Sequence, residues 1–187
     1  MSPAPAPRLN VLGVGISATD LAAATDRTIA AAASGQPLGV SALAVHAVME
    51  AHSHPDYRAR LNTLDLAAPD GQPVRWALNA LHGAGLRTRV YGPFLMQAVC
   101  ARAAQDGLPI YLFGGTAETL GPLATRLAAA HPGLRVAGTR PSRFRRISEA
   151  EARQDAQAIA GSGVNFISVG ALTQSARAVD LGLDFED

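Results

Sequence analysis

The stretch LPIYLFGG (residues 108–115) decides the fold, because its apolar run is the clearest buried strand in the sequence and it ends in two glycines. A segment of helical period follows over residues 117–130. Outward from this unit, in both directions, short apolar runs alternate with helical segments. Strands are expected at 10–16, just before residue 70, at 134–139 and at 164–170, and the segment 38–51 is expected to begin as a strand and continue as a helix. Helices are expected at 21–34, at 54–64, from about 73, at 94–105 and at 148–163.

This alternation predicts a single α/β domain with a Rossmann-like, mainly parallel sheet, flanking helices and right-handed crossovers. Ligands bind to such sheets at the carboxyl ends of the strands. A functional site is therefore expected in the loops that follow Ala68, Phe113 and Gly138.

Composition limits the classes of function. The chain has 187 residues, of which 48% are apolar and 17% charged, as in one well-packed domain. Sixteen basic and fifteen acidic residues leave a formal charge of +1, so we expect no nucleic-acid partner. The single cysteine, Cys100, cannot form an internal disulfide, and its place on an apolar helix face indicates a buried, inert thiol.

Residues 1–9 include three prolines and are expected to form a flexible leader. This segment lacks the apolar region of a signal peptide, and no stretch reaches the roughly 18 apolar residues of a transmembrane helix. We therefore expect a cytoplasmic protein.

Asp70 is the first candidate for chemistry. It follows an expected strand and precedes Gly71 and Pro73, which places its carboxylate at the sheet edge, where it can serve as a general base. Asp-Gly is also an ordinary turn pair, and this segment alone leaves both interpretations open.

Two further segments suit phosphate. Arg87 and Arg89 lie in a loop ahead of a helix, where guanidinium groups can hold a phosphate by paired hydrogen bonds or can simply be solvated. The turn FGGTAET (residues 113–119) joins bare glycine backbone to a helix N-terminus with Thr116 as its cap. It either binds phosphate or only forms a tight turn.

No metal and no cofactor is predicted. The segment AHSHPDY (residues 51–57) has no fourth ligand at a diagnostic spacing, so its histidines are expected at the surface. Gly13 and Gly15 do not complete a dinucleotide fingerprint, because Ala18 replaces the third glycine. The basic cluster in residues 142–153 is expected to cover the start of a solvated helix or to help hold a diphosphate, through Arg143, Arg145 and Arg146.

Four blocks, taken in order, resemble one family. They are residues 46–78, 89–96, 110–120 and 131–151, and their order and spacing are similar to those of the WecG/TagA/CpsF glycosyltransferases, glycosyltransferase family 26. The patterns PDG-x-P-x-x-W and RVYGP-x-L-M are the most specific parts of this resemblance. It covers residues 10–163, which we take as the glycosyltransferase domain.

The resemblance implies an enzyme: an inverting, metal-independent transfer of an N-acetylmannosamine-type sugar or another hexose from a UDP-sugar. The implied acceptor is a lipid-linked saccharide of exopolysaccharide, capsule or teichoic acid synthesis, reached in the cytoplasm at the inner face of the membrane; homo-oligomers stay open. Asp70 matches the general base and Arg89 the residue that stabilises the diphosphate leaving group. Substrate-binding roles are implied for Gly71, Tyr91, Gly92, Gly114, Gly115, Thr116 and Arg140.

The chain also departs from the family. Ala42 and Ala44 stand where many members carry polar residues near the sugar, which leaves the sugar open. Residues 164–187 form a divergent strand and tail, so the C-terminal part of the family fold is expected to be missing or replaced. Residues 165–186 resemble the tail of quinolinate phosphoribosyltransferase, with Gln174 in place of its usual histidine. An inactive nucleotide-binding remnant and a binder of phosphoribosyl phosphates are the alternatives to the enzyme.

Overall fold

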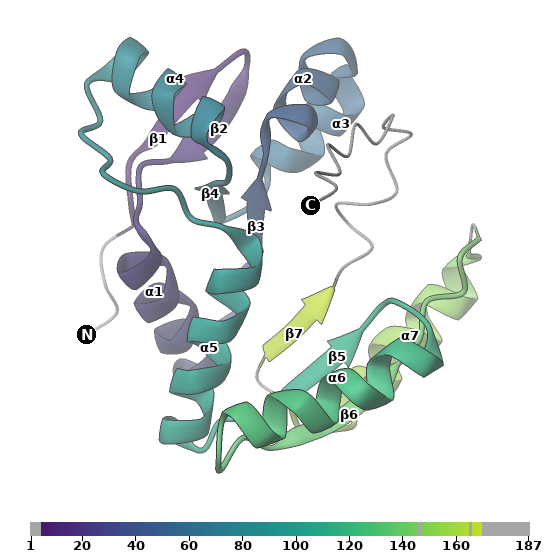
Figure 1. Ribbon diagram of the computed structural model, residues 1–187. Helices are drawn as coiled ribbons and strands as arrows, with labels where there is room; N and C mark the ends of the chain where they lie inside the picture. The colour runs from purple at the N-terminus through teal and green to yellow at the C-terminus, as the bar shows by residue number, and fades with distance from the viewer. Residues whose placement is uncertain (1–4, 146, 165, 170–187) are drawn as a thin grey trace, which may run out of the picture.

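The stretch that decides the fold is β5 (Ile110–Phe113), the middle strand of a parallel sheet in which β6 (Val136–Arg140) and β7 (Phe166–Val169) lie on either side (Figure 1). The computed structural model describes residues 5–145, 147–164 and 166–169. Helix α6 (Ala117–Ala130) follows β5, and α7 (Glu149–Ala160) lies between β6 and β7 in the chain. The predicted strand-helix alternation is confirmed in this half.

A second parallel pair lies earlier in the chain. β3 (Val40–Leu43) pairs in register with β4 (Leu66–Pro69), and α2 (Val45–Ser53) and α3 (Pro55–Asn62) form the connection between them. After β4 come α4 (Gln72–His82) and α5 (Gly92–Asp106). The predicted passage from strand into helix within residues 38–51 is confirmed.

The expected strand at 10–16 is two strands. β1 (Arg8–Val11) and β2 (Val14–Ser17) form an antiparallel hairpin. Its two turn residues, Leu12 and Gly13, have φ angles of 53° and 90°, and positive φ at both central positions is the signature of the tight turns that suit hairpins. The sequence did not predict this turn, because it lies within an apolar run and a leucine at positive φ is uncommon.

The α/β class is confirmed, with the parallel strands divided between two small sheets. The edge of β4 that faces away from β3 already has partners. The buried Ser17 Oγ accepts a hydrogen bond from the Ala67 N–H at 3.2 Å, and the Val90 N–H donates to the Pro69 carbonyl at 2.9 Å. The hairpin and the segment before α5 thus occupy the edge on which a further strand would have to pair.

Local signals place the first helix where the sequence predicts it. α1 (Leu21–Ser34) begins after Asp20, whose carboxylate accepts from the Ala23 N–H at 2.8 Å. It ends at Gly35, which has a φ of 66° and a left-handed conformation that glycine adopts without steric cost. α1 lies beside α5, joined by an ion pair between Arg102 and Asp26 at 2.8 Å (Figure 1).

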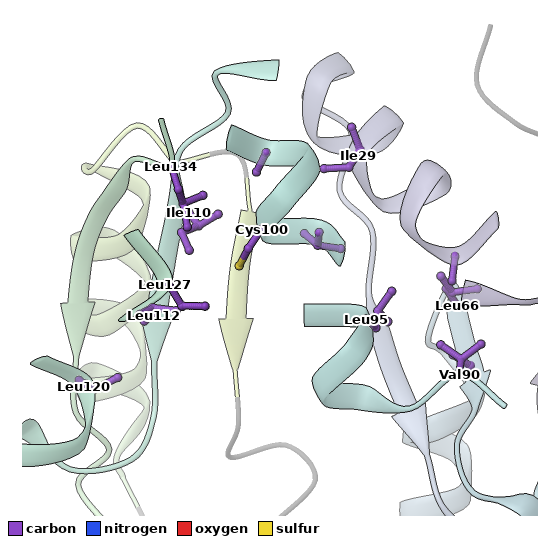
Figure 2. Close-up of a cluster of buried hydrophobic side chains, with 14 residues drawn as sticks. Ile29, Leu66, Val90, Leu95, Cys100, Ile110, Leu112, Leu120, Leu127 and Leu134 are labelled. Atoms are coloured by element: carbon purple, nitrogen blue, oxygen red, sulfur yellow. The ribbon is translucent and has the colours of Figure 1, made fainter. Parts of the chain in front are cut away.

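One hydrophobic core joins the β3–β4 sheet to the β5–β6–β7 sheet (Figure 2). It contains Leu66 from β4, Val99 from α5, Ile110 from β5 and Leu127 from α6, together with residues of α1. Cys100 belongs to this core and is 2% exposed, so the predicted buried thiol is confirmed. A second core packs the β1–β2 hairpin against α2, α3 and α4.

None of the helices in the described part of the chain is long and apolar enough to cross a membrane.

Candidate functional site

Asp70 lies at the carboxyl end of β4, as predicted. Its N–H donates to the Leu43 carbonyl at 3.1 Å, which continues the β3–β4 pairing by one residue. Its half-buried side chain turns toward the start of α5, where the Gly92 N–H donates to Oδ2 at 3.4 Å. The loop after β4 therefore holds this carboxylate at the sheet edge in a fixed direction.

The turn interpretation of Asp70-Gly71 and the site interpretation are compatible. Gly71 has φ and ψ of 78° and 152° and is the last residue before α4, which has Pro73 in its first turn. A side chain at this φ is strained, so glycine is needed for the chain to leave β4 and enter α4 at once. The same sharp turn leaves the Asp70 carboxylate at the edge.

The start of α5 brings the RVYG block to this carboxylate. Gly92 is the first residue of α5, and a Cβ built on it would lie 3.4 Å from the Ala42 Cβ and 3.7 Å from Asp70 Oδ2. The ends of β3 and β4 and the beginning of α5 thus meet at one place. Ala42, near the end of β3, belongs to this place.

An aromatic pair with an arginine stands next to Gly92. The Arg89 guanidinium carbon lies 4.9 Å from the centre of the Tyr91 ring, and the Tyr91 and Phe94 rings meet edge to face at 5.2 Å. Phe94 is 62% exposed. Sequence reasoning missed Phe94, although an aromatic residue inside the RVYGPFLM block was the available signal. Stacking on Tyr91 directs the planar guanidinium, and within the described part of the chain its N–H groups form no hydrogen bond or ion pair, which leaves them to a ligand.

The second predicted segment is the turn after β5. Gly114 and Gly115 have φ angles of 119° and 63°. The Gly114 N–H donates to the Arg140 carbonyl at 3.0 Å, and the Ser142 N–H donates to the Gly115 carbonyl at 3.0 Å. Thr116 is the N-cap of α6 as predicted. Two hydrogen bonds therefore tie the glycine turn to the segment that follows β6.

A carboxylate already stands at the N-terminus of α6. Glu118 is in the first turn, and hydrogen bonds from its own backbone N–H and from the Thr116 side chain lower the pKa of the Glu118 carboxyl. An anionic ligand at this helix end therefore has to displace Glu118 or bind beside it.

Arg140 is placed at the end of β6, where its guanidinium forms an ion pair with Asp155 of α7. The same Asp155 oxygen, Oδ1, accepts from Arg143 Nη2 at 3.1 Å. Arg143 and Arg145 also pair with Glu151, at 3.4 and 2.6 Å. Hydrogen bonds from Arg143 and Arg140 lower the pKa of the Asp155 carboxyl. Hydrogen bonds from Arg145 and the Ser148 backbone lower the pKa of the Glu151 carboxyl to about 2. Arg146 lies outside the described residues.

The predicted site residues fall into two groups. Asp70, Gly71, Arg89, Tyr91 and Gly92 gather at the β4 end, and Gly114, Gly115, Thr116 and Arg140 gather at the β5 and β6 ends. Within the described residues no hydrogen bond or ion pair joins the two groups. Both groups lie where parallel strands end, as the fold class predicts.

The histidines expected at the surface are exposed. His52 Nδ1 lies 3.4 Å from the Leu12 carbonyl oxygen, and His54 Nδ1 lies 3.0 Å from that of Glu50. The side chains that the structure describes contain no group of three or more histidine, cysteine, aspartate or glutamate residues placed to hold a metal ion.

Carboxylate, arginine and glycine-turn groups at the strand ends of a parallel α/β fold are typical of enzymes that act on small charged substrates. Comparison with protein families matches residues 9–174 to the family described as "Glycosyl transferase WecG/TagA/CpsF family". The chain belongs to this family. The match extends beyond residue 163 and includes β7, so this strand is part of the family fold. Membership implies a sugar donor and an acceptor as substrates in general.

Proposed function

We propose that this protein transfers an N-acetylmannosamine-type sugar or another hexose from a UDP-sugar to a lipid-linked saccharide, with inversion, in the synthesis of a bacterial cell-surface polysaccharide. The observation that carries the proposal is the position of Asp70, whose carboxylate is fixed at the β4 end by the Gly92 N–H. The family supplies the reaction class, and the placement of Asp70 supports its role as the base.

Asp70 removes a proton from the acceptor hydroxyl. Gly92 occupies Oδ2, and Oδ1 accepts no hydrogen bond within the described part of the chain, so this oxygen is the one offered to the acceptor. The hydroxyl oxygen forms a bond to the anomeric carbon while the bond from that carbon to the diphosphate oxygen breaks. The proton ends on Asp70, UDP leaves, and a single displacement inverts the anomeric centre.

Arg89 stabilises the negative charge that grows on the diphosphate as it leaves. Its guanidinium is always charged, and it stands over Tyr91, on the same short segment that brings Gly92 to Asp70. Base and leaving-group stabiliser therefore belong to one cluster, as a displacement between acceptor and diphosphate requires.

The nucleotide side of the donor binds at the turn Gly114–Gly115, next to Thr116 and Arg140. Glycine backbone allows close approach of a phosphate or ribose, and Arg140 supplies positive charge beside the turn. Because the acceptor carries a lipid, the reaction takes place in the cytoplasm at the inner face of the membrane.

A second candidate function is nucleotide binding without transfer. Ala42 favours it, because this position lies beside Gly92 and Asp70 yet offers no polar group to a sugar. The two candidates differ in a measurable way: both predict UDP binding, but only the enzyme releases UDP when a UDP-sugar and a lipid-linked acceptor are both present.

Calorimetric titration of the purified chain with UDP, and in parallel with phosphoribosyl diphosphate, tests the donor site. UDP binding without phosphoribosyl diphosphate binding is the expected result. If only phosphoribosyl diphosphate binds, the proposal is wrong, and the resemblance of residues 165–186 to quinolinate phosphoribosyltransferase gains support; nearly all of that segment lies outside the described residues. Binding of neither compound rejects the donor site.

A further inference from the structure

Asp155 stands out among the carboxylates because it is 6% exposed, far from either predicted catalytic residue in the chain, and bonded to two arginines at once. Burying a carboxylate costs free energy unless the charge is paired. The ion pairs with Arg140 and Arg143 therefore stabilise Asp155 and at the same time fix the positions of the two arginine side chains. We infer that Asp155 is a positioning residue, which fixes Arg140 beside the Gly114–Gly115 turn for a nucleoside diphosphate. The inference rests on the proposed function and deepens it.

The first step concerns the exposure and the bonding of the Arg140 side chain. Its side chain is 27% exposed, and within the described residues its guanidinium donates to Asp155 alone. A guanidinium has five N–H groups in a fixed plane. Asp155 therefore fixes the plane of the guanidinium through one nitrogen and leaves other N–H groups for a ligand.

The second step is the connection from Asp155 to the glycine turn. The Arg140 carbonyl accepts from the Gly114 N–H, and the Ser142 N–H donates to the Gly115 carbonyl, both at 3.0 Å. Asp155 holds the side chains on both sides of this short segment, Arg140 and Arg143. A single side chain on α7 thus sets the position of the backbone that lines the turn.

The third step is the make-up of the cluster. Among described residues it contains the arginines 140, 143 and 145 around the carboxylates Glu151 and Asp155. An arginine-rich cluster on the segment that is bonded to a glycine turn fits a diphosphate better than a neutral ligand.

Positioning and simple electrostatics predict opposite results for Asp155→Asn. Loss of a negative charge near the turn would tighten the binding of an anion, whereas loss of the fixed Arg140 would weaken it. We expect UDP affinity to fall about tenfold, the order of effect of one well-placed charged hydrogen bond. Calorimetry with UDP as the probe measures this change.

Glu149→Gln is the matched control. Glu149 is on the same helix and also pairs with an arginine, Arg153, but both side chains are largely exposed. Among the described residues, neither forms a hydrogen bond or ion pair with the 140–142 segment. Its substitution removes the same charge from α7, and UDP affinity is expected to stay within about twofold of the original. A loss of affinity as large as that of Asp155→Asn would overturn the inference.

A double-mutant cycle with Arg140→Gln separates positioning from general loosening of the fold. If Asp155 acts through Arg140, Asp155→Asn weakens UDP binding little further once Arg140 is replaced. Independent, additive losses would contradict this. Should Asp155→Asn fail to fold, Asp155→Glu keeps the charge but moves it by one methylene; weaker UDP binding supports positioning, and unchanged affinity overturns it.

Failure of the proposed function gives a different pattern. If the original chain binds no UDP, the donor site itself is rejected, and the inference falls with it. If the original chain binds UDP and Asp155→Asn, folded by circular dichroism, binds it equally well or more tightly, only the role of Asp155 is wrong.

Discussion

The backbone N–H of Gly92 donates to the carboxylate of Asp70 at 3.4 Å, although the two residues are separated by the whole of α4 and the loop after it. This contact fixes the direction of the carboxylate and defines its free oxygen. It also joins the PDG and RVYG sequence blocks, which no local pattern in the sequence connects.

Asp70→Asn should leave the fold and UDP affinity unchanged and lower sugar transfer by about a hundredfold or more, the usual size of a general-base contribution. The amide keeps the shape of the side chain but cannot take the acceptor proton. UDP release in the presence of donor and acceptor measures the rate. Asp56→Asn is the control, because Asp56 is an exposed aspartate in the first turn of α3. An unchanged rate in Asp70→Asn would eliminate it as the base.

Glu118→Gln should raise UDP affinity by roughly two- to fivefold, in the range of a single charge at a helix terminus. Glu118 occupies the N-terminus of α6 beside the Gly114–Gly115 turn, and its charge repels a phosphate there. Titration of the variant with UDP checks this. Weaker binding would show that Glu118 helps to form the site instead of competing for it.

The elements were predictable from the sequence to a large extent, because their signals are local. The apolar run of β5, the Asp20 and Gly35 caps of α1 and the buried side of Cys100 depend on nearby residues. The β1–β2 hairpin was not predicted, since its turn places Leu12 at positive φ. Nothing in a single sequence marks this conformation for a leucine.

Long-range contacts account for the parts of the site that were missed. Asp155 looks like an ordinary helix residue in the sequence, and it pairs with Arg140 only because α7 returns to the end of β6. The division into two sheets has the same origin: the contacts of Ser17 and Val90 with β4 connect residues far apart in the chain.

Acid should destabilise the 143–155 network in a defined range. Hydrogen bonds from Arg145 and the Ser148 backbone lower the pKa of Glu151 from 4.5 to about 2. Between these values the unfolded chain binds a proton that the folded chain does not, so stability falls as the pH drops through this window. Urea unfolding at several pH values between about 5 and 3 measures the slope.

Glu151→Gln removes this titration and should reduce the slope of stability against pH. The variant should also be less stable at neutral pH, because the amide loses the ion pairs of Glu151 with Arg143 and Arg145, while it can keep the capping box with Ser148. An identical slope in both proteins would show that the acid sensitivity comes from other carboxylates.

Gly138→Ala should destabilise the protein by about 1–3 kcal/mol, the cost of overpacking a core. A Cβ at Gly138 would lie 2.6 Å from a ring carbon of the buried Tyr111 on the neighbouring strand. Gly121→Ala is the control, because Gly121 is inside α6 with open space around its Cβ position. That variant should stay within about 1 kcal/mol of the original, because the gain of alanine in a helix is opposed by the steric demand of the following Pro122. Equal stabilities in urea would contradict the packing of β5 against β6.

Cys100 should resist thiol reagents in the folded protein. Burial raises the pKa of the thiol to about 11, so that about one molecule in a thousand carries the reactive thiolate at pH 8. The rate of reaction with a disulfide reagent, measured with and without urea, checks this. Labelling as fast in the native protein as in urea would mean that α5 opens readily.

The make-up of the two hydrophobic cores sets an order for folding on the ribosome. The core that packs the β1–β2 hairpin is built from Val11 to Leu78, with Leu86 at its margin, and is complete when about half of the chain has emerged. The core around α5 needs Leu127 and Leu134, so it stays open until those residues leave the exit tunnel. Until then the nascent chain exposes the apolar faces of α1 and α5, and exposed apolar surface of this kind favours aggregation.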